Sequence, residues 1–357
     1  MRNDVTASRH SPTLDLHHTL LAATKGQGVA SVSVISSPGT APDTSWVPTS
    51  GEEPAFLAYS ITKIFTAALI LTFCEDGHLS LDDHLARWFP KIADADRISL
   101  RRLLNHTAGI PDYGGVYAYH QGVRMSPSTP WSFERFAAET LENGLLFAPG
   151  QGWEYSNVGY MLLKRIIEQV GGATFGEIIS ERIARRLGLE RTFVAESIED
   201  LASLAAGMSS ELDPDGVPRD VRAYYHPGWV SHGVLASTSS EIVRFLDALF
   251  GGKLLVPGSV EQMMELVAVS IDEGSTGNGP LRAGRPSYGL GVMADPDSPW
   301  GLIAGHNGGG PCYSASAFHA FDLGGVSVCA MGAIEREFSA EGVVAHVLDH
   351  SSLKASA

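Results

Sequence analysis

The sequence lacks the features of several large protein classes. Its three cysteines, Cys74, Cys312 and Cys329, form no C-x-x-C pair and are odd in number, which excludes a disulfide framework and fits a reducing compartment. No segment reaches the roughly eighteen apolar residues of a membrane span, and the first residues lack the apolar core of a signal peptide. We therefore expect a cytoplasmic chain without a membrane partner.

Positive charge is also scarce. Lys and Arg number 25 against 40 Asp and Glu, a net charge of -15 at pH 7, which argues against nucleic acid as a partner. The 13 histidines are scattered and form no basic face. With 357 residues, 44% hydrophobic and 18% charged, the chain is long enough for two packed regions or one large domain. Its oligomeric state is left open.

Several catalytic motifs are missing. There is no G-x-S-x-G elbow, no H-E-x-x-H zinc motif, and no Walker or dinucleotide motif. The glycines at 308–310 lack the following G-K-[ST] of a phosphate loop. We therefore predict no cofactor and no metal, although scattered histidines leave a metal site open.

Hydrophobic periodicity indicates a sheet formed from both ends of the chain. An amphipathic helix is expected at 13–26, and the segments with strand patterns are 28–39, 44–49, 286–294, 300–309, 313–322 and 325–333. A helix at 340–350 follows them, and the middle of the chain is mostly helical with Gly and Pro loops. We predict an α/β (α+β) fold, an antiparallel sheet flanked by helices with a large, mostly helical insertion. The predicted domains are 1–75 with 235–357, and 76–234, with the active site between them.

The segment from Ser60 to Cys74 reads as a buried helix with a single charge, Lys63. A buried lysine costs several kcal/mol unless it is paired or neutral. Residues three apart share a helix face, so the Lys63 amine can reach the Ser60 hydroxyl and, when neutral, take its proton. Free N–H groups at the first turn favour an oxyanion. The alternatives are an N-cap serine and a lysine that extends to the surface.

The S-x-x-K pattern is weak by itself. A second copy, Ser351 to Lys354, lies in what we expect to be a polar tail with a solvated lysine. A second element, Tyr155-Ser156-Asn157, precedes an amphipathic helix that ends at Gly171 and Gly172. Asn157 fits a helix N-cap and Tyr155 an aromatic contact, but a tyrosine can relay a proton and an asparagine amide can hold a lysine and a carbonyl.

A third element, His306-Asn307-Gly308, ends a predicted strand, and the glycines allow a close approach of backbone and ligand. The alternative is a histidine that is hydrogen-bonded in a turn. His226-Pro227-Gly228 has the same spacing in a loop, so this pattern also needs its context.

Taken together, these patterns resemble the serine β-lactamase and penicillin-binding-protein superfamily. Their order and spacing, with "LLNHTAGIPDY", "GHLSLDDHLARWFP", "YSNVGY" and "GVLASTSSEIVRFLDALF", are similar to the class C-like branch. That branch includes D-amino-acid amidases, D-aminopeptidases, family VIII esterases, DD-peptidases and related acyltransferases. The resemblance covers about residues 14 to 350.

The resemblance implies a role for each matching residue. Ser60 would be the acylated nucleophile, Lys63 its base and Tyr155 the proton shuttle. The N–H groups of Ser60 and Gly309 would form the oxyanion hole. The substrate-binding residues would be Asn157, His306, Gly308 and the pocket-lining Tyr113.

One residue departs from the β-lactamase pattern. His306 stands where those enzymes have a lysine that attracts a substrate carboxylate, and a histidine near pKa 6.5 is mostly neutral at pH 7. Carboxylate-bearing β-lactams are therefore expected to be poor substrates. H-x-G does occur in some DD-peptidases, however, and Arg282 or Arg285 would offer a replacement charge.

The predicted function is a serine hydrolase or acyltransferase. Its acyl donor would be a small amide or ester, either a D-amino-acid amide or peptide or a carboxylic ester, and the acceptor would be water, an amine or an alcohol. The alternatives are a biosynthetic transacylase, a DD-carboxypeptidase or β-lactamase, and a covalent penicillin sensor or catalytically silent scaffold.

Overall fold

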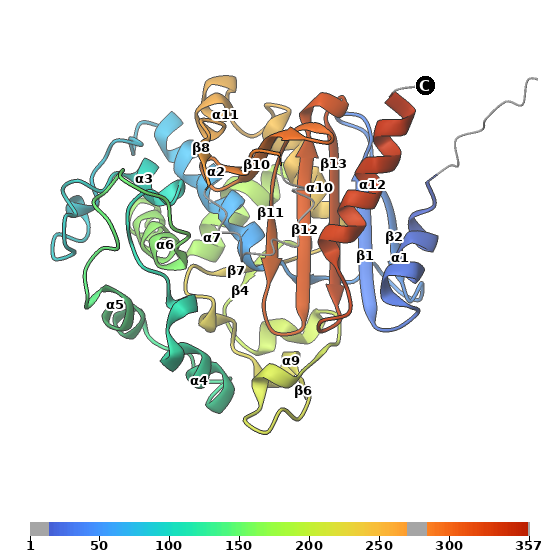
Figure 1. The fold of residues 1–357 in the computed structure, drawn as a ribbon, viewed down its shortest axis with the longest axis horizontal. Coiled ribbons are helices and arrows are strands. Elements are labelled where there is room, and N and C mark those ends of the chain that lie inside the picture. The colour runs from blue at the N-terminus through green and yellow to red at the C-terminus, as the bar shows by residue number, and fades with distance from the viewer. Residues whose placement is uncertain (1–13, 270–283, 356–357) are drawn as a thin grey trace, which may run out of the picture.

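The architecture is centred on one antiparallel sheet (Figure 1). The structure is a computed structural model that describes residues 14–269 and 284–355. The sheet has eight strands in the order β2-β1-β13-β12-β11-β10-β9-β8. Their bounds are β1 Val29–Ile35, β2 Asp43–Val47, β8 Val267–Ala268, β9 Ser287–Tyr288, β10 Met293–Ser298, β11 Gly301–Gly309, β12 Tyr313–Ala320 and β13 Val326–Ala333.

The two ends of the chain meet inside this sheet. Strands β1 and β13 pair antiparallel from Val29 opposite Ala333 to Ile35 opposite Ser327. The predicted fold class, with a sheet completed by early and late strands, is therefore confirmed.

Helices cover both faces of the sheet, so the central strands β1, β13 and β12 are buried on both sides. Helices α1 (Leu16–Thr24) and α12 (Ala340–Ala355) pack on one face, and α10 (Ser239–Phe250) packs on the other. The small polar residues of β1 therefore face a helix, and Ser33 Oγ lies 2.7 Å from Ser239 Oγ. The alternation in this strand thus reflects small serines buried under α10, of which Ser33 is hydrogen-bonded, and it does not mark a solvent-exposed face.

The remaining helices and strands lie mainly in the middle of the chain. The helices are α2 Thr62–Glu75, α3 Leu100–Leu104, α4 Tyr117–Met125, α5 Phe133–Leu141, α6 Asn157–Gly171, α7 Phe175–Ile179, α8 Arg185–Leu187, α9 Val221–Tyr224 and α11 Pro257–Met263. The short strands β3 (Phe56–Leu57), β7 (Val234–Ser237) and β4 (Phe193–Ala195) form a second sheet, and β5 (Met208–Ser209) pairs with β6 (Arg219–Asp220). The division into two domains at 76 and 234 stays a prediction.

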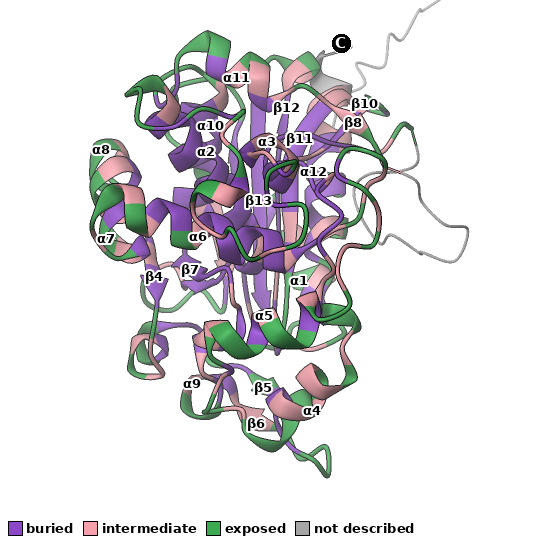
Figure 2. Ribbon diagram, turned by 90° about the vertical axis from the view of Figure 1, so that its left-hand side faces the viewer, coloured by how far each residue is buried: buried purple, intermediate pink, exposed green. Residues whose placement is uncertain are grey.

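Helix α2 runs through the middle of the molecule, and twelve of its fourteen residues are buried. This helix is apolar on all sides, as expected for a core helix, and Phe65 stacks on Phe245 of α10 with ring centroids 3.6 Å apart. Figure 2 shows the buried interior between the sheet and the outer helices. The predicted helix from Ser60 is therefore present, beginning with a short 3-10 turn at Tyr59–Ile61.

The C-terminal helix extends further than the sequence analysis predicted. Ser351 to Lys354 lie inside helix α12, so the expectation of a polar tail was wrong. Helix α12 continues to Ala355, although the small and charged residues at its end gave little indication of a helix. Across the described ranges, no helix is long and apolar enough to cross a bilayer.

Candidate active site

The 3-10 turn before α2 presents Ser60 at the edge of strand β11. Tyr59 has φ 44°, a left-handed conformation that disfavours a bulky residue by about 1–2 kcal/mol. Its buried ring anchors the turn, because the Tyr59 hydroxyl donates to the Pro311 carbonyl at 3.1 Å. The strained residue thus lies directly before the candidate nucleophile.

Strand β11 approaches this turn closely at Gly308. A Cβ at Gly308 would lie 2.2 Å from the Ala58 carbonyl oxygen and 3.3 Å from the Ser60 nitrogen. No other residue type fits there without moving the backbone. Because Gly308 has no side chain, strand β11 can lie directly against the backbone at Ala58 and Ser60.

Lys63 is completely buried one helical turn after Ser60. Its Nζ lies 3.0 Å from Ser60 Oγ, 2.7 Å from Asn157 Oδ1 and 3.2 Å from His232 Nε2. Burial lowers the pKa of Lys63 well below its usual value, and the Asp112 carboxylate opposes this only partly. A buried amine of this kind is suited to accept a proton.

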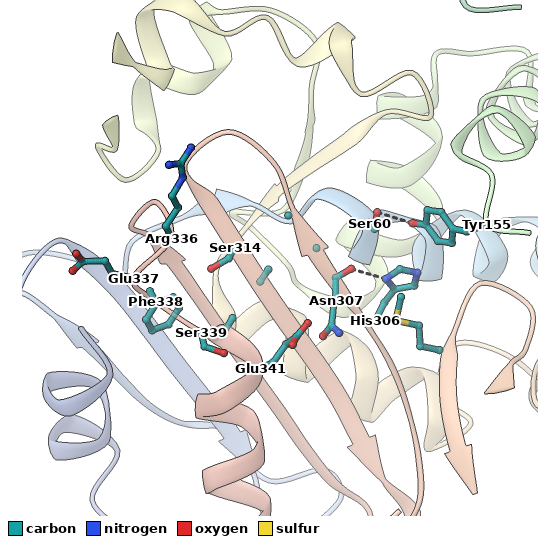
Figure 3. Close-up of a pocket in the computed structure, with 15 residues that line it drawn as sticks. Ser60, Tyr155, His306, Asn307, Ser314, Arg336, Glu337, Phe338, Ser339 and Glu341 are labelled. Atoms are coloured by element: carbon teal, nitrogen blue, oxygen red, sulfur yellow. Dashed lines mark hydrogen bonds between the residues drawn. The ribbon is translucent and has the colours of Figure 1, made fainter. Parts of the chain in front are cut away.

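Tyr155 contacts the same serine from the other side. Its hydroxyl donates to Ser60 Oγ at 2.8 Å (Figure 3). Burial raises the pKa of Tyr155, so the phenol keeps its proton. Ser60 Oγ therefore lies between a lysine with a lowered pKa and a protonated tyrosine, and these two groups suit opposite proton-transfer steps.

Asn157 begins helix α6, but the N-cap is Ser156, whose Oγ accepts from the Gly159 N–H. The alternative explanation of Asn157 as the N-cap is therefore wrong, because the serine one position earlier has the extended backbone that a cap requires. Asn157 instead holds Lys63 through its Oδ1. Its Nδ2 donates to Asp112 Oδ2 at 3.2 Å, and its backbone N–H donates to Asp112 Oδ1 at 2.7 Å. Asp112 thereby fixes which end of the amide faces the lysine.

His306 is fully buried in β11. Its Nδ1 lies 2.5 Å from the Asn307 carbonyl oxygen and its Nε2 3.0 Å from the Tyr288 hydroxyl. Burial and the neighbouring Lys63 lower the pKa of His306 to about 3. The side chain is therefore neutral across the physiological range, with Nδ1–H donating and Nε2 accepting.

Of the two arginines considered as replacement charges, Arg282 lies outside the described residues. Arg285 forms an ion pair with Asp297 at 3.1 Å, and 62% of its side chain is exposed. A different arginine, Arg336, lines the pocket that contains Ser60.

The pocket beside Ser60 has a volume of about 480 Å³ and runs along β11 to the start of α12 (Figure 3). The predicted site residues that line it are Ser60, Tyr155, His306, Gly308 and Gly309. Lys63 and Asn157 do not line the pocket, but Lys63 is hydrogen-bonded to Ser60 and Asn157 is hydrogen-bonded to Lys63. At the far end, burial raises the pKa of Glu341 to about 7.

Tyr113 is placed differently. Its ring is buried against Tyr119 and Phe136, with centroids 4.5 Å and 5.0 Å away, and it is not among the residues that line the pocket. The structure therefore brings seven of the eight predicted residues together around Ser60, and Tyr113 supports the adjoining loop.

The sequence reasoning did not identify Asp112 and His232 near Ser60, or Glu341 at the far end of the pocket. Asp112 had a local signal, since it lies in the "GIPDYGG" loop that was already singled out. His232 and Glu341 had none, because their contacts come from segments far away in the chain.

No group of three His, Cys, Asp or Glu side chains within 14–269 and 284–355 could hold a metal ion.

Comparisons with known proteins identify the family of this chain. A family model described as Beta-lactamase matches residues 25–325. Penicillin-binding protein 4* of Bacillus subtilis (strain 168) is 29% identical over 280 residues, covering 74% of this chain and 57% of that protein. The chain thus spans a little over half the length of the first curated relatives that it matches.

Solved structures share the fold over nearly the whole chain. A D-stereospecific amidohydrolase from Streptomyces has a TM-score of 0.76 at 26% identity, covering 92% of this chain and 97% of that one. A D-amino acid amidase from Ochrobactrum anthropi SV3, complexed with L-phenylalanine amide, has a TM-score of 0.75 at 23% identity, covering 96% of each chain. The second likeness concerns the fold alone.

Proposed function

Because this chain belongs to the Beta-lactamase family, we propose that it is a serine hydrolase that forms an acyl-enzyme on Ser60 from small amides or esters. The observation that carries the proposal is the buried Lys63 amine, 3.0 Å from Ser60 Oγ. Its lowered pKa leaves a lone pair for the serine proton. A solvated lysine would be a cation and could not act in this way.

The acylation step follows from the positions of three side chains. Ser60 Oγ bonds to the substrate carbonyl carbon while its proton passes to Lys63. The oxyanion would be held by the backbone N–H groups of Ser60 and Gly309. When the C–N or C–O bond breaks, Tyr155 supplies a proton to the leaving group, and the proton on Lys63 then restores the phenol. Water attacks the ester by the reverse sequence.

The pocket contains a fixed cation, Arg336, but the groups at the His306 position and at Glu341 favour a substrate without a carboxylate. His306 is neutral, so it offers no fixed positive charge at the position where β-lactamases have lysine. Glu341, with a pKa raised to about 7, is about half ionised near neutral pH and would repel an anion. D-aminoacyl amides are our preferred substrate class, because a D-stereospecific amidohydrolase shares both sequence and fold with this chain.

Intact-mass spectrometry after treatment with a fluorophosphonate tests the nucleophile. We expect one adduct, mapped to Ser60 by peptide analysis. No adduct on folded protein would contradict the proposal and favour the silent scaffold. Adduct formation with amides and esters but no turnover would favour the covalent sensor.

A substrate panel tests the finer claim. Amides of D- and L-amino acids, carboxylic esters and a cephalosporin should be compared by kcat/KM. We expect the D-amide to be hydrolysed fastest and the cephalosporin slowest. High efficiency on the cephalosporin would overturn the charge argument while leaving the acyl-enzyme intact.

A further inference from the structure

His232 is the third polar partner of the Lys63 amine. Its Nε2 lies 3.2 Å from Lys63 Nζ, and only 2% of the residue is exposed. Its other ring nitrogen, Nδ1, has no hydrogen-bond partner among the residues that the structure describes. The imidazole therefore has a single polar contact, and that contact is the candidate base.

Backbone hydrogen bonds connect the segment that contains His232 to the segment that contains Ser60. The residue lies in a tight turn closed by Gly233 N–H donating to the Val230 carbonyl at 2.8 Å, and strand β7 follows directly. Leu235 of β7 accepts from the Ala58 N–H at 2.7 Å and donates its own N–H to Thr62 Oγ1 at 3.0 Å. Strand β7 is thus hydrogen-bonded to the chain on both sides of Ser60, so the backbone next to His232 is fixed relative to the backbone around the nucleophile.

Counting hydrogens at Lys63 Nζ shows what this contact does. A neutral amine has two hydrogens and one lone pair, and Nζ has three polar neighbours. The Asn157 Oδ1 is an acceptor because Asp112 holds the other end of that amide. If His232 Nε2 accepts the second hydrogen, the lone pair is left for the Ser60 hydroxyl.

We propose that His232 is a positioning residue whose neutral Nε2 accepts a hydrogen from Lys63 and thereby directs the Lys63 lone pair at Ser60. This inference rests on the proposed function. When Lys63 takes the serine proton, the same acceptor faces an ammonium hydrogen, and a hydrogen bond to a charged donor is roughly twice as strong. His232 therefore stabilises the state that develops during acylation.

The surroundings keep the imidazole neutral. Burial lowers the pKa of His232 well below its usual value, and cationic or potentially cationic neighbours act in the same direction. These are Lys63 from α2, His306 from β11, Lys164 from α6 and His106 from the loop after α3. The nearest carboxylate acting on Lys63 is Asp112. A proton released by Ser60 thus goes to Lys63, and His232 remains an acceptor.

Replacing His232 should change the pH dependence of Ser60 labelling in a defined direction. Without an acceptor at position 232, protonated Lys63 has one unpaired buried hydrogen, so the pKa of Lys63 falls further. The acidic limb of the labelling rate against pH then moves to lower pH, and the plateau falls because the weaker base is poorly oriented. A histidine that acted through positive charge would shift the limb in the opposite direction.

The test measures the second-order rate of fluorophosphonate labelling at Ser60 between pH 5 and 10. For His232→Leu we expect a plateau about 10- to 100-fold lower and a midpoint lower by about 0.5 to 1 pH unit. His232→Gln places an amide oxygen near the position of Nε2 and should recover the rate to within about threefold. The matched control is His319→Gln, another buried histidine, whose Nδ1 lies 2.8 Å from Ser327 Oγ; it should leave the midpoint unchanged.

Thermal unfolding of each variant checks that it is folded, and the Gln variant keeps the test valid if the Leu variant is not. An unchanged or raised midpoint in folded His232→Leu, or no recovery in His232→Gln, would overturn the role of His232 alone. Absence of Ser60 labelling in the unmodified protein would overturn the proposed function together with this inference.

Discussion

The two S-x-x-K tetrapeptides of this chain lie on helices and differ in nearly everything else. In the first, Lys63 is fully buried and its amine lies 3.0 Å from Ser60 Oγ. In the second, Ser351 is part of α12, and its hydroxyl donates to the Val347 carbonyl of its own helix at 3.0 Å. Equal spacing therefore places one serine against a buried lysine amine and leaves the other hydrogen-bonded to its own helix.

The difference comes from remote segments. Around the first tetrapeptide, Tyr155, Asn157 and His232 supply a proton donor and two acceptors. The second serine is satisfied by the ordinary back-bond of a helix. The tetrapeptide thus places the lysine within reach of the serine, whereas the burial of the lysine and the residues around it decide how the two groups can react.

Removing each serine gives the largest contrast between the two sites. Ser60→Ala removes the atom that becomes acylated, so we expect complete loss of the fluorophosphonate adduct by intact mass. Ser351→Ala should label at the unmodified rate and change the free energy of unfolding by no more than about 0.5 kcal/mol. An adduct that persists in Ser60→Ala would show that another residue is the nucleophile.

Replacing the buried lysine comes next. Lys63→Met keeps the length of the side chain and removes the base, so acylation should fall by about 10²- to 10⁴-fold, measured as the labelling rate at pH 8. A rate near that of the unmodified protein would refute the role of Lys63 as base.

The same variant should become more stable at neutral pH. A lysine whose pKa is lowered on folding binds its proton more readily in the unfolded state, so its contribution to the free energy of unfolding rises with pH towards about 10.4. Denaturant unfolding of Lys63→Met and the unmodified protein should therefore differ most near pH 7 and least near pH 10. A pH-independent difference would contradict a buried lysine with a lowered pKa.

Tyr155→Phe should have a smaller effect on acylation, about 10²-fold, because Lys63 still accepts the serine proton. The loss should be greater for an amide than for an activated ester, whose leaving group needs no proton. Steady-state rates on a matched amide and 4-nitrophenyl ester check this, and equal losses on both would contradict the role of Tyr155 as proton donor.

The smallest effect is expected from Asp112→Asn. This change removes the carboxylate that raises the pKa of Lys63 and one orienting contact of Asn157, but it keeps an acceptor at the same place. We expect roughly a tenfold loss or less, with the acidic limb of the labelling rate moved to lower pH. A shift to higher pH would contradict the electrostatic role of Asp112.

Much of the fold followed from hydrophobic pattern. The late segments at 300–333 formed strands β11, β12 and β13, and the apolar run after Ser60 formed α2. Helix ends were less predictable, because Ser156 and Asn157 are both good N-caps and only the backbone conformation decides between them. The continuation of α12 through Ser351 was missed because short polar residues carry little helical signal.

The candidate site was predictable where each motif carries its own chemistry, as in Ser60 and Lys63. His232 was not, since nothing in its neighbourhood in the sequence indicates a contact 169 residues away. Tyr113 shows the converse, because its loop was recognised but its ring turned into an aromatic cluster with Tyr119. Long-range packing decided these cases, and periodicity does not encode it.

The pairing of β1 with β13 has a consequence for synthesis on the ribosome. Lys63 is translated early, but the strands that bound its pocket follow residue 300. At about 5–20 residues per second, roughly 15 to 50 s separate the two events. For the first part of that interval helix α2, which is almost wholly buried in the folded protein, lacks α10, and throughout the interval it lacks the completed sheet. The pocket beside Ser60 is therefore incomplete until the last strands have been made.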